Sequence, residues 1–75
     1  MATDKSENTV ASIHERIYRA ILDNRLKPGT KLVEERLAEI FEVSRPRIRE
    51  VLARLAHEQI VDLFPQRGAY VAKPS

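Results

Sequence analysis

Apolar residues in the first part of the chain recur at the spacing of one helix face; they are Ile13, Ile17, Ala20 and Ile21. The run Ser12–Glu15 has the form of a capping box, in which a hydroxyl residue precedes Glu by three positions. These features predict a first helix from about Ser12 to Asn24, which Asn24 ends by adopting the left-handed conformation. The run Lys27–Thr30 then predicts a type II turn, followed by a stub of strand at Lys31–Leu32.

Two more amphipathic segments follow with little chain between them. Apolar residues at helical spacing continue from Val33 and predict a second helix over about Val33–Phe41. They are Leu37, Ile40 and Phe41. Ser44 is a good N-cap for a third helix that ends near Glu58. The inward stripe of this helix consists of Ile48, Val51, Leu52 and Leu55. Two helices joined by so short a turn are typical of a helix-turn-helix unit.

From Ile60 onward the apolar pattern becomes that of extended chain. Residues 60–64 are rich in β-forming side chains, residues 65–68 predict a turn, and residues 69–72 predict a second strand. We therefore predict an α+β fold, mainly α: a winged helix-turn-helix with three helices plus a C-terminal β-hairpin wing. Residues 12–72 would form this domain, with residues 1–11 as a flexible N-terminal tail and residues 73–75 as the start of a linker or simply the end of the chain.

Composition limits the possible functions of so short a chain. A chain of 75 residues forms one small domain that buries only about 60% of its unfolded surface, which leaves no room for a deep catalytic pocket. Cysteine is absent, so we expect no disulfide framework and no thiolate zinc site, and a reducing cytoplasm is compatible. The polar N-terminal stretch holds no apolar run that could be a signal peptide or membrane span. We expect a cytoplasmic protein that needs no cofactor and contacts no membrane.

Positive charge gathers in the second half of the chain. Lys and Arg number seven against eight Asp and Glu through Val43, but six against three from Ser44 onward. Arg45, Arg47 and Arg49 crowd the start of the predicted third helix, where the helix dipole disfavours cations. Such a cluster makes sense if an anion binds there, and phosphate is the obvious one. In a helix-turn-helix, residues at this position contact base edges in the major groove, and Arg recognises guanine through paired hydrogen bonds.

Both candidate binding segments also have a simpler interpretation. The arginine cluster could be a solvated surface, with Arg47 paired to Glu50 and Glu50 to Arg54 along the helix. At the hairpin tip, Gly68 can take positive φ, and Arg67 can project toward a groove or a phosphate. The alternative there is a plain turn that needs glycine for its geometry and carries arginine for solubility.

Pro46 leaves two ways of starting the third helix, because proline has no N–H and restricts the residue before it. Either Ser44 caps the N–H of Arg47, or Arg45 takes the cap position with Pro46 first in the helix. In both cases Arg45 is held at the junction of turn and helix, where a phosphate or base contact would be made.

Six short motifs occur in a specific order and spacing. They are Ile17-Tyr18, Leu26–Gly29, Leu37–Glu39, Val43–Arg45, Arg49–Leu55 and Arg67–Val71. Together they resemble the N-terminal domain of GntR-family transcription regulators over residues 12–72, and the close of the hairpin is similar to the branch with an all-helical effector-binding domain. Carried over residue by residue, the DNA contacts of the family fall on Ser44, Arg45 and Arg49, and on Gly68 with its neighbour Arg67.

The chain departs from the family pattern at three points. Pro46-Arg47 stands where the family commonly has Thr-Pro, so a charged contact from Arg47 is expected in place of a hydroxyl contact. Glu35 stands where relatives often carry an arginine, and Arg36 follows it as the candidate phosphate contact. Gln59 replaces the usual glycine after the third helix, which predicts a strained turn.

The resemblance implies a regulator of metabolic genes, in most cases a repressor. Its partners would be double-stranded DNA, bound at a short imperfect palindrome, and a second copy of the full-length protein in a homodimer. A small-molecule effector would bind only through a C-terminal domain that is absent from this chain.

Two other classes of function are weighed against DNA binding. An enzyme is disfavoured, because His14 and His57 fall on separate predicted helices with no cysteine or obvious carboxylate pair beside them, and a metal site needs more ligands. A winged helix can also serve as a protein-protein interaction or RNA-binding module. Single-stranded RNA would favour exposed stacking aromatics, but Phe41, Phe64 and Tyr70 fit core or strand positions.

Overall fold

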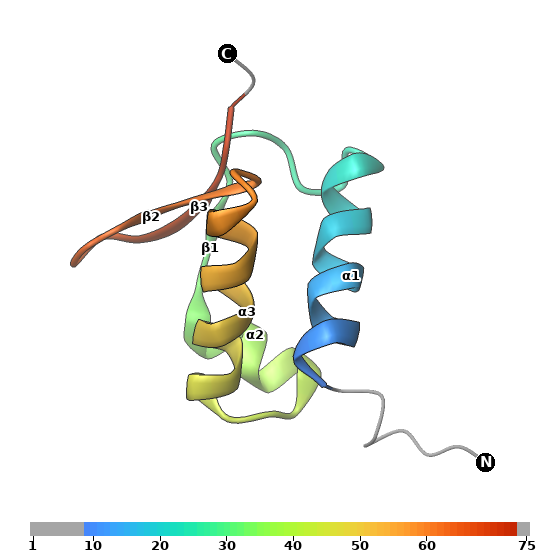
Figure 1. Cartoon of the computed structure of the whole chain (residues 1–75), viewed down its shortest axis with the longest axis vertical. Coiled ribbons are helices and arrows are strands. Elements are labelled where there is room, and N and C mark those ends of the chain that lie inside the picture. Colours follow the sequence, from blue (N-terminus) through green and yellow to red (C-terminus); the bar gives the residue numbers. More distant parts are fainter. Residues whose placement is uncertain (1–8, 74–75) are drawn as a thin grey trace.

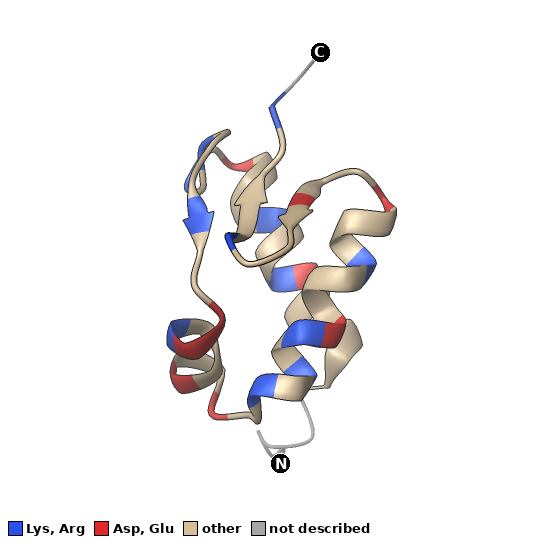
Figure 2. Ribbon diagram, turned by 90° about the vertical axis from the view of Figure 1, so that its left-hand side faces the viewer, with Lys and Arg blue, Asp and Glu red and all other residues tan. Residues whose placement is uncertain are grey.

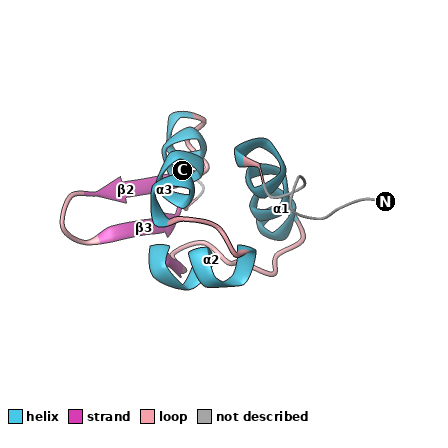
Figure 3. Ribbon diagram, turned by 90° about the horizontal axis from the view of Figure 1, so that it is seen from below, coloured by secondary structure: helices cyan, strands magenta, loops and turns pink. Residues whose placement is uncertain are grey.

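The computed structural model describes residues 9–73 and contains three helices and a three-stranded sheet in that range (Figure 1). The elements follow in the order α1 (Val10–Leu22), β1 (Lys31–Leu32), α2 (Glu34–Phe41), α3 (Arg45–His57), β2 (Val61–Phe64) and β3 (Gly68–Val71). The hairpin of β2 and β3 projects from the helices on the side away from α1 (Figures 1 and 3). The predicted α+β architecture, three helices followed by a C-terminal hairpin wing, is confirmed.

The stub of strand before α2 is part of the wing's sheet. β1 pairs with β3, and β3 pairs with β2, both antiparallel, so β3 is the central strand. Lys31 lies opposite Tyr70, and Leu32 lies opposite Ala69. The sequence predicts the length of β1 but not its partner. This pairing attaches the wing to the segment that leads directly into α2.

The first helix begins earlier than its predicted capping box. Thr9 is the N-cap: its Oγ1 accepts a hydrogen bond from the Ser12 N–H at 3.1 Å. Ser12 lies inside the first turn, and its own hydroxyl donates to the Thr9 carbonyl at 3.4 Å. The capping-box prediction at Ser12 is therefore wrong, because the hydroxyl three residues upstream satisfies the helix start first. Of the predicted tail and linker, residues 1–8 and 74–75 lie outside the described residues.

Each helix is followed by a residue with a left-handed backbone that is not glycine. These residues are Asn24, Glu42 and Gln59, with φ of 63°, 57° and 65°. The predicted left-handed conformation of Asn24 is confirmed, although α1 itself ends earlier, at Leu22. After α3, the Gln59 N–H donates to the Ala56 carbonyl and the Ile60 N–H to the Leu55 carbonyl, both at 2.9 Å, which is a Schellman arrangement. The strain predicted at Gln59 follows from this φ, which L side chains disfavour.

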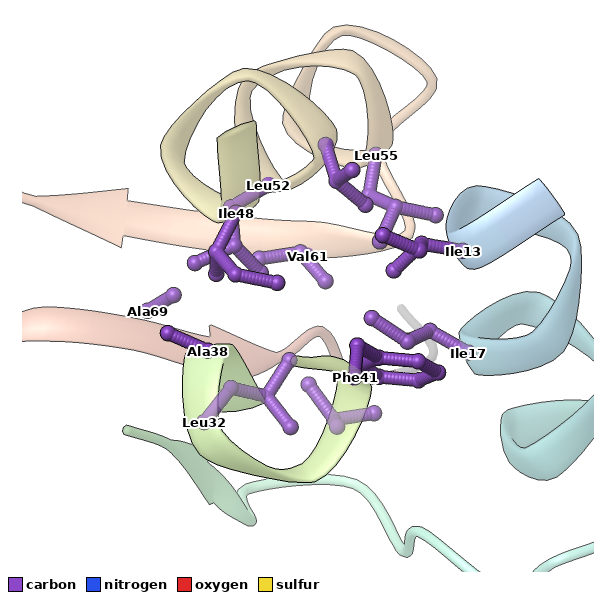
Figure 4. Packing of buried hydrophobic residues seen from close by; sticks show 12 residues of the cluster. Ile13, Ile17, Leu32, Ala38, Phe41, Ile48, Leu52, Leu55, Val61 and Ala69 are labelled. Atoms are coloured by element: carbon purple, nitrogen blue, oxygen red, sulfur yellow. The ribbon is translucent and has the colours of Figure 1, made fainter. Parts of the chain in front are cut away.

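One apolar core joins the helices to the sheet (Figure 4). The predicted stripe of α3 lies at its centre, since Ile48, Val51, Leu52 and Leu55 are exposed by at most 4%. No polar or charged side chain is buried among residues 9–73. The helical spacing placed Ile40 on the apolar face of α2, but its side chain is 63% exposed. That part of the prediction is wrong, because the face of α2 that meets the core carries Leu37, Ala38 and Phe41.

Candidate nucleic-acid interface

The start of α3 is fixed by its cap. Ser44 is the N-cap, and its Oγ accepts a hydrogen bond from the Arg47 N–H at 3.3 Å. Pro46 follows Arg45 within the first turn of the helix, where the missing N–H would have had no partner in any case. The first of the two predicted starts is thus confirmed. It leaves Arg45, Arg47 and Arg49 exposed at the beginning of α3.

A carboxylate from the neighbouring helix joins two of these arginines. Arg45 Nε lies 3.3 Å from Glu34 Oε1. Arg49 donates twice, from Nε to Oε2 at 2.9 Å and from Nη2 to Oε1 at 3.2 Å. Glu34 stands in the first turn of α2, and Figure 2 shows acidic residues on α2 facing the arginines that recur along α3. The two-point contact fixes the plane of the Arg49 guanidinium, which a single contact would leave free to rotate.

The electrostatics of this cluster favour the charged forms of Glu34 and Arg49. Hydrogen bonding from Arg49 holds the pKa of Glu34 below its ordinary value of 4.5, against the opposing effect of partial burial, and Arg45 lowers it further. The carboxylate in turn raises the pKa of Arg49. The side chain of Glu34 is 24% exposed, whereas those of Arg45 and Arg49 are 58% and 67% exposed. The cluster therefore presents arginine to solvent and keeps its carboxylate mostly covered.

The hairpin presents the second group of predicted residues. The turn between β2 and β3 contains Gln66 at a φ of 68°, and the Arg67 N–H donates to the Phe64 carbonyl at 3.0 Å. Gly68 opens β3 with a φ of 110°, a conformation that requires glycine. Phe64 contacts Tyr70 edge to face, with ring centroids 5.7 Å apart. These two rings pack against each other across the strands, as strand aromatics do.

A groove lies between α3, the start of α2 and the wing. Its polar and glycine lining consists of Lys31, Glu34, Arg49, Gln66, Arg67 and Gly68. The fold thus brings Arg49 of the helix together with Arg67 and Gly68 of the wing, although they are 18 and 19 positions apart in the chain. Arg36 is exposed on α2 and does not line this groove, and neither do Ser44, Arg45 and Arg47.

The two histidines occupy structural positions. The Nε2 atom of His14 on α1 lies 2.7 Å from the Oε1 atom of Glu58 at the end of α3. The His14 ring stacks on Tyr18. His57 is exposed in the last turn of α3. Within residues 9–73 no three His, Cys, Asp or Glu side chains are grouped so that they could hold a metal ion. No helix in this range is long and apolar enough to cross a membrane.

Comparison with protein families identifies the family of this chain. The model of the bacterial regulatory proteins, gntR family, matches residues 9–71. The chain belongs to the GntR family. It is a DNA-binding domain of a transcription regulator, as the resemblance of its motifs predicts.

Individual GntR relatives and solved structures agree with this assignment. The HTH-type transcriptional repressor RspR of Escherichia coli (strain K12) is 34% identical over 79 residues, covering 100% of this chain and 35% of RspR. A GntR family member from Pseudomonas syringae pv. tomato str. DC3000 superposes with a TM-score of 0.81 at 32% identity, over 96% of this chain and 30% of that one. The NTD of AraR, in complex with mutant ORR3, gives a TM-score of 0.78 at 28% identity, over 84% of this chain and 91% of that one.

The chain spans about a third of the length of the curated relatives it matches first. The NTD of AraR, by contrast, is matched over nearly its whole chain. The match therefore covers the DNA-binding part of longer regulators.

Sequence reasoning missed Glu34 in this GntR domain. It looked for arginine partners along the third helix itself, where Glu50 could pair with Arg47 and Arg54. The partner found for Arg45 and Arg49 stands 11 and 15 positions upstream, across the turn of the helix-turn-helix. Only the crossing of α2 and α3 brings these groups together. The available signal was an acidic residue in the first turn of the helix that precedes an arginine cluster.

Proposed function

We propose that this GntR domain recognises a short, imperfect palindrome of double-stranded DNA, with α3 in the major groove and the hairpin wing on the adjacent groove or backbone. The observation that carries the proposal is the Glu34 contact that fixes Arg49 at the edge of the groove between α3 and the wing. Base recognition needs hydrogen-bond donors with a set direction, and the carboxylate supplies that direction.

The hydrogen-bond inventory of Arg49 supports base recognition. A guanidinium has five N–H donors, and Glu34 takes one on Nε and one on Nη2. Three donors remain, on the edge that carries Nη1 and Nη2, and two of them suffice for guanine O6 and N7. Arg45 gives only its Nε to Glu34 and keeps its remaining donors. Both arginines can therefore hold the carboxylate and a base at once.

The remaining candidate residues fit contacts to the DNA backbone. Ser44 accepts a hydrogen bond through its Oγ but keeps its own O–H to donate to a phosphate. Arg36, Arg47 and Arg67 are exposed cations on α2, α3 and the wing. Gly68 lets the backbone of the wing approach the DNA closely. Such contacts set the orientation of the domain without specifying sequence.

We further propose that the full-length regulator acts in the cytoplasm as a metabolite-responsive, homodimeric repressor. The named relative RspR is a transcriptional repressor, and this chain corresponds to 35% of it. The remaining part would supply the contact between copies and the effector site. Large exposed apolar residues are few among residues 9–73 and are distributed over α1, α2 and β2, so we expect no stable dimer of this domain alone.

A binding experiment tests the DNA assignment. The preferred site is selected from a random duplex library, and fluorescence anisotropy then compares the selected duplex, a scrambled duplex and a single-stranded RNA of the same sequence. We expect the selected duplex to bind best and the affinity to fall steeply with salt, by about 0.9 in the slope of log K for each neutralised phosphate. An affinity that does not depend on salt, or a preference for the RNA, would contradict the proposal.

The dimer is tested separately. Analytical ultracentrifugation should show the 75-residue chain as a monomer. Fusion to a dimerising helix should raise affinity for the palindrome on the order of a hundredfold, because the second binding event becomes intramolecular. Mobility shifts on palindromes with varied half-site spacing measure this gain. Equal affinity of monomer and fusion would show that dimerisation plays no part in recognition.

A further inference from the structure

The groove between α3 and the wing carries more positive charge than the candidate DNA contacts account for. Three cations line it, Lys31, Arg49 and Arg67, against one carboxylate, Glu34. That carboxylate is already bonded to Arg49 and Arg45. Within residues 9–73, Lys31 and Arg67 have no ion-pair partner. The groove therefore has an excess of two positive charges that no described side chain neutralises.

Lys31 lines this groove from the edge strand of the sheet. Lys31 is the exposed residue of β1, while its neighbour Leu32 is buried. It pairs with Tyr70, and Gly68 lies on the same face of β3 as Tyr70 because side chains alternate along a strand. A Cβ built on Gly68 would lie 3.3 Å from Lys31 Cε. The lysine stem thus passes over the start of β3, where Gly68 leaves space for it, and runs toward the tip of the wing.

We propose that Lys31 is a further contact to the DNA backbone. Its ammonium binds a phosphate of the DNA strand that borders the groove between the start of α3 and the wing. This inference rests on the proposed function. A flexible ammonium with three donors suits a phosphate, which needs charge rather than a fixed plane of donors. Arg49 would then contact the bases on one side of the groove while Lys31 and Arg67 bind the strand that borders it.

The test compares two lysines that differ in position alone. Lys31→Gln and Lys27→Gln each remove one exposed positive charge, but Lys27 lies in the turn before β1 and does not line the groove. We expect Lys31→Gln to weaken binding several-fold on selected and scrambled duplexes alike, and to reduce the slope of log K against log salt by about 0.9. Lys31→Arg should keep the slope, and Lys27→Gln should stay within about twofold of wild type.

Chemical rescue separates charge from folding. Because the 75 residues contain no cysteine, Lys31→Cys offers a single thiol, and aminoethylation of that thiol restores a side chain of lysine-like length and charge. We expect aminoethylation to restore the salt slope and carboxymethylation to leave it reduced.

Two results would overturn the assignment of Lys31. The first is a Lys31→Gln variant that binds like Lys27→Gln. The second is a loss confined to the selected duplex, because a backbone contact acts on every sequence. Failure of the wild-type chain to bind duplex DNA would instead refute the proposed function, so the two proposals fail in distinguishable ways.

Discussion

The start of α3 and the tip of the wing both present arginine, but they hold it in different ways. Arg49 makes two hydrogen bonds to Glu34, a carboxylate on another helix. Arg67 is fixed only through its backbone, by the N–H that donates to the Phe64 carbonyl, and its side chain has no ion-pair partner among residues 9–73. The difference matches what each contact requires: a base edge accepts donors from one direction, whereas a phosphate attracts charge from many.

The carboxylate also reduces the entropic cost of recognition. Ordering a long side chain on binding costs about 0.5–1.5 kcal/mol. Where Glu34 already orders the guanidinium, part of that cost is met during folding. Under the proposed function, the Arg67 side chain of the wing is ordered only when DNA is bound, which suits a segment that must fit sites of differing shape.

The largest expected effect contrasts Arg49 with Arg67. Arg49→Ala should cost about 1–3 kcal/mol on the selected duplex and little on a scrambled one, because a base contact carries sequence information. Arg67→Ala should weaken both duplexes by similar factors. Arg54→Ala serves as the control, since Arg54 is exposed on α3 outside the groove. Competition titrations measure all three variants. Equal losses on both duplexes for Arg49→Ala would place it with the backbone contacts.

A smaller effect is expected when the carboxylate is neutralised. Glu34→Gln should lower affinity for the selected duplex several-fold, because Arg49 loses its fixed direction, and should raise affinity for scrambled DNA, because a negative charge near the phosphates is removed. Glu35→Gln is the matched control: Glu35 is the exposed neighbour with the same charge and no ion pair within residues 9–73. Identical behaviour of the two variants would refute the positioning role of Glu34.

A third prediction concerns the turn at Gln59, which connects α3 to the first strand of the wing. Gln59→Gly should stabilise the domain by about 0.5–1 kcal/mol, because glycine adopts the observed φ of 65° without strain. Gln59→Ala should bring no such gain. Urea unfolding gives the free energies, and anisotropy should show unchanged affinity, since this turn lies outside the groove. A stabilised variant with altered sequence preference would mean that the turn at Gln59 determines the orientation of the wing relative to α3.

The smallest effect is the pH dependence of the Glu34 cluster. Hydrogen bonding from Arg49 lowers the pKa of Glu34 in the folded state below 4.5. Its stabilising contribution is therefore fully present above the unfolded value and is lost as pH falls through the lower folded value. Wild type should exceed Glu34→Gln in urea midpoint near pH 7 by a small margin, as exposed ion pairs do. This margin should shrink with acid below about pH 4. A margin that stays constant with pH would show that the carboxylate charge contributes nothing.

Local patterns predicted much of this fold, since their causes lie within a few residues. The stripe of α3 follows from helical spacing. The hydroxyl of Ser44 predicted the cap, although Pro46 left Arg45 as a second possible cap position. Two hydroxyls close together, Thr9 and Ser12, made the start of α1 ambiguous. The Glu34 contacts and the pairing of β1 with β3 depend on how distant segments cross, which periodicity does not encode. The candidate DNA contacts came from the arginine cluster at the predicted helix start, from the predicted hairpin turn and from motif resemblance, and they stay predictions.

The pairing of β1 with β3 has a consequence for protein engineering. One unbroken segment, residues 31–49, contains the strand that anchors the wing, the carboxylate Glu34 and the arginines that Glu34 orients. Transplanting the exposed residues of α3 alone into another winged helix would move the arginines without their support. A functional graft would have to take residues 31–49 as a unit and keep a recipient β3 that accepts Leu32 opposite a small residue such as Ala69. Under the proposed function, operator preference would therefore be transferred only with β1, α2 and the start of α3 together.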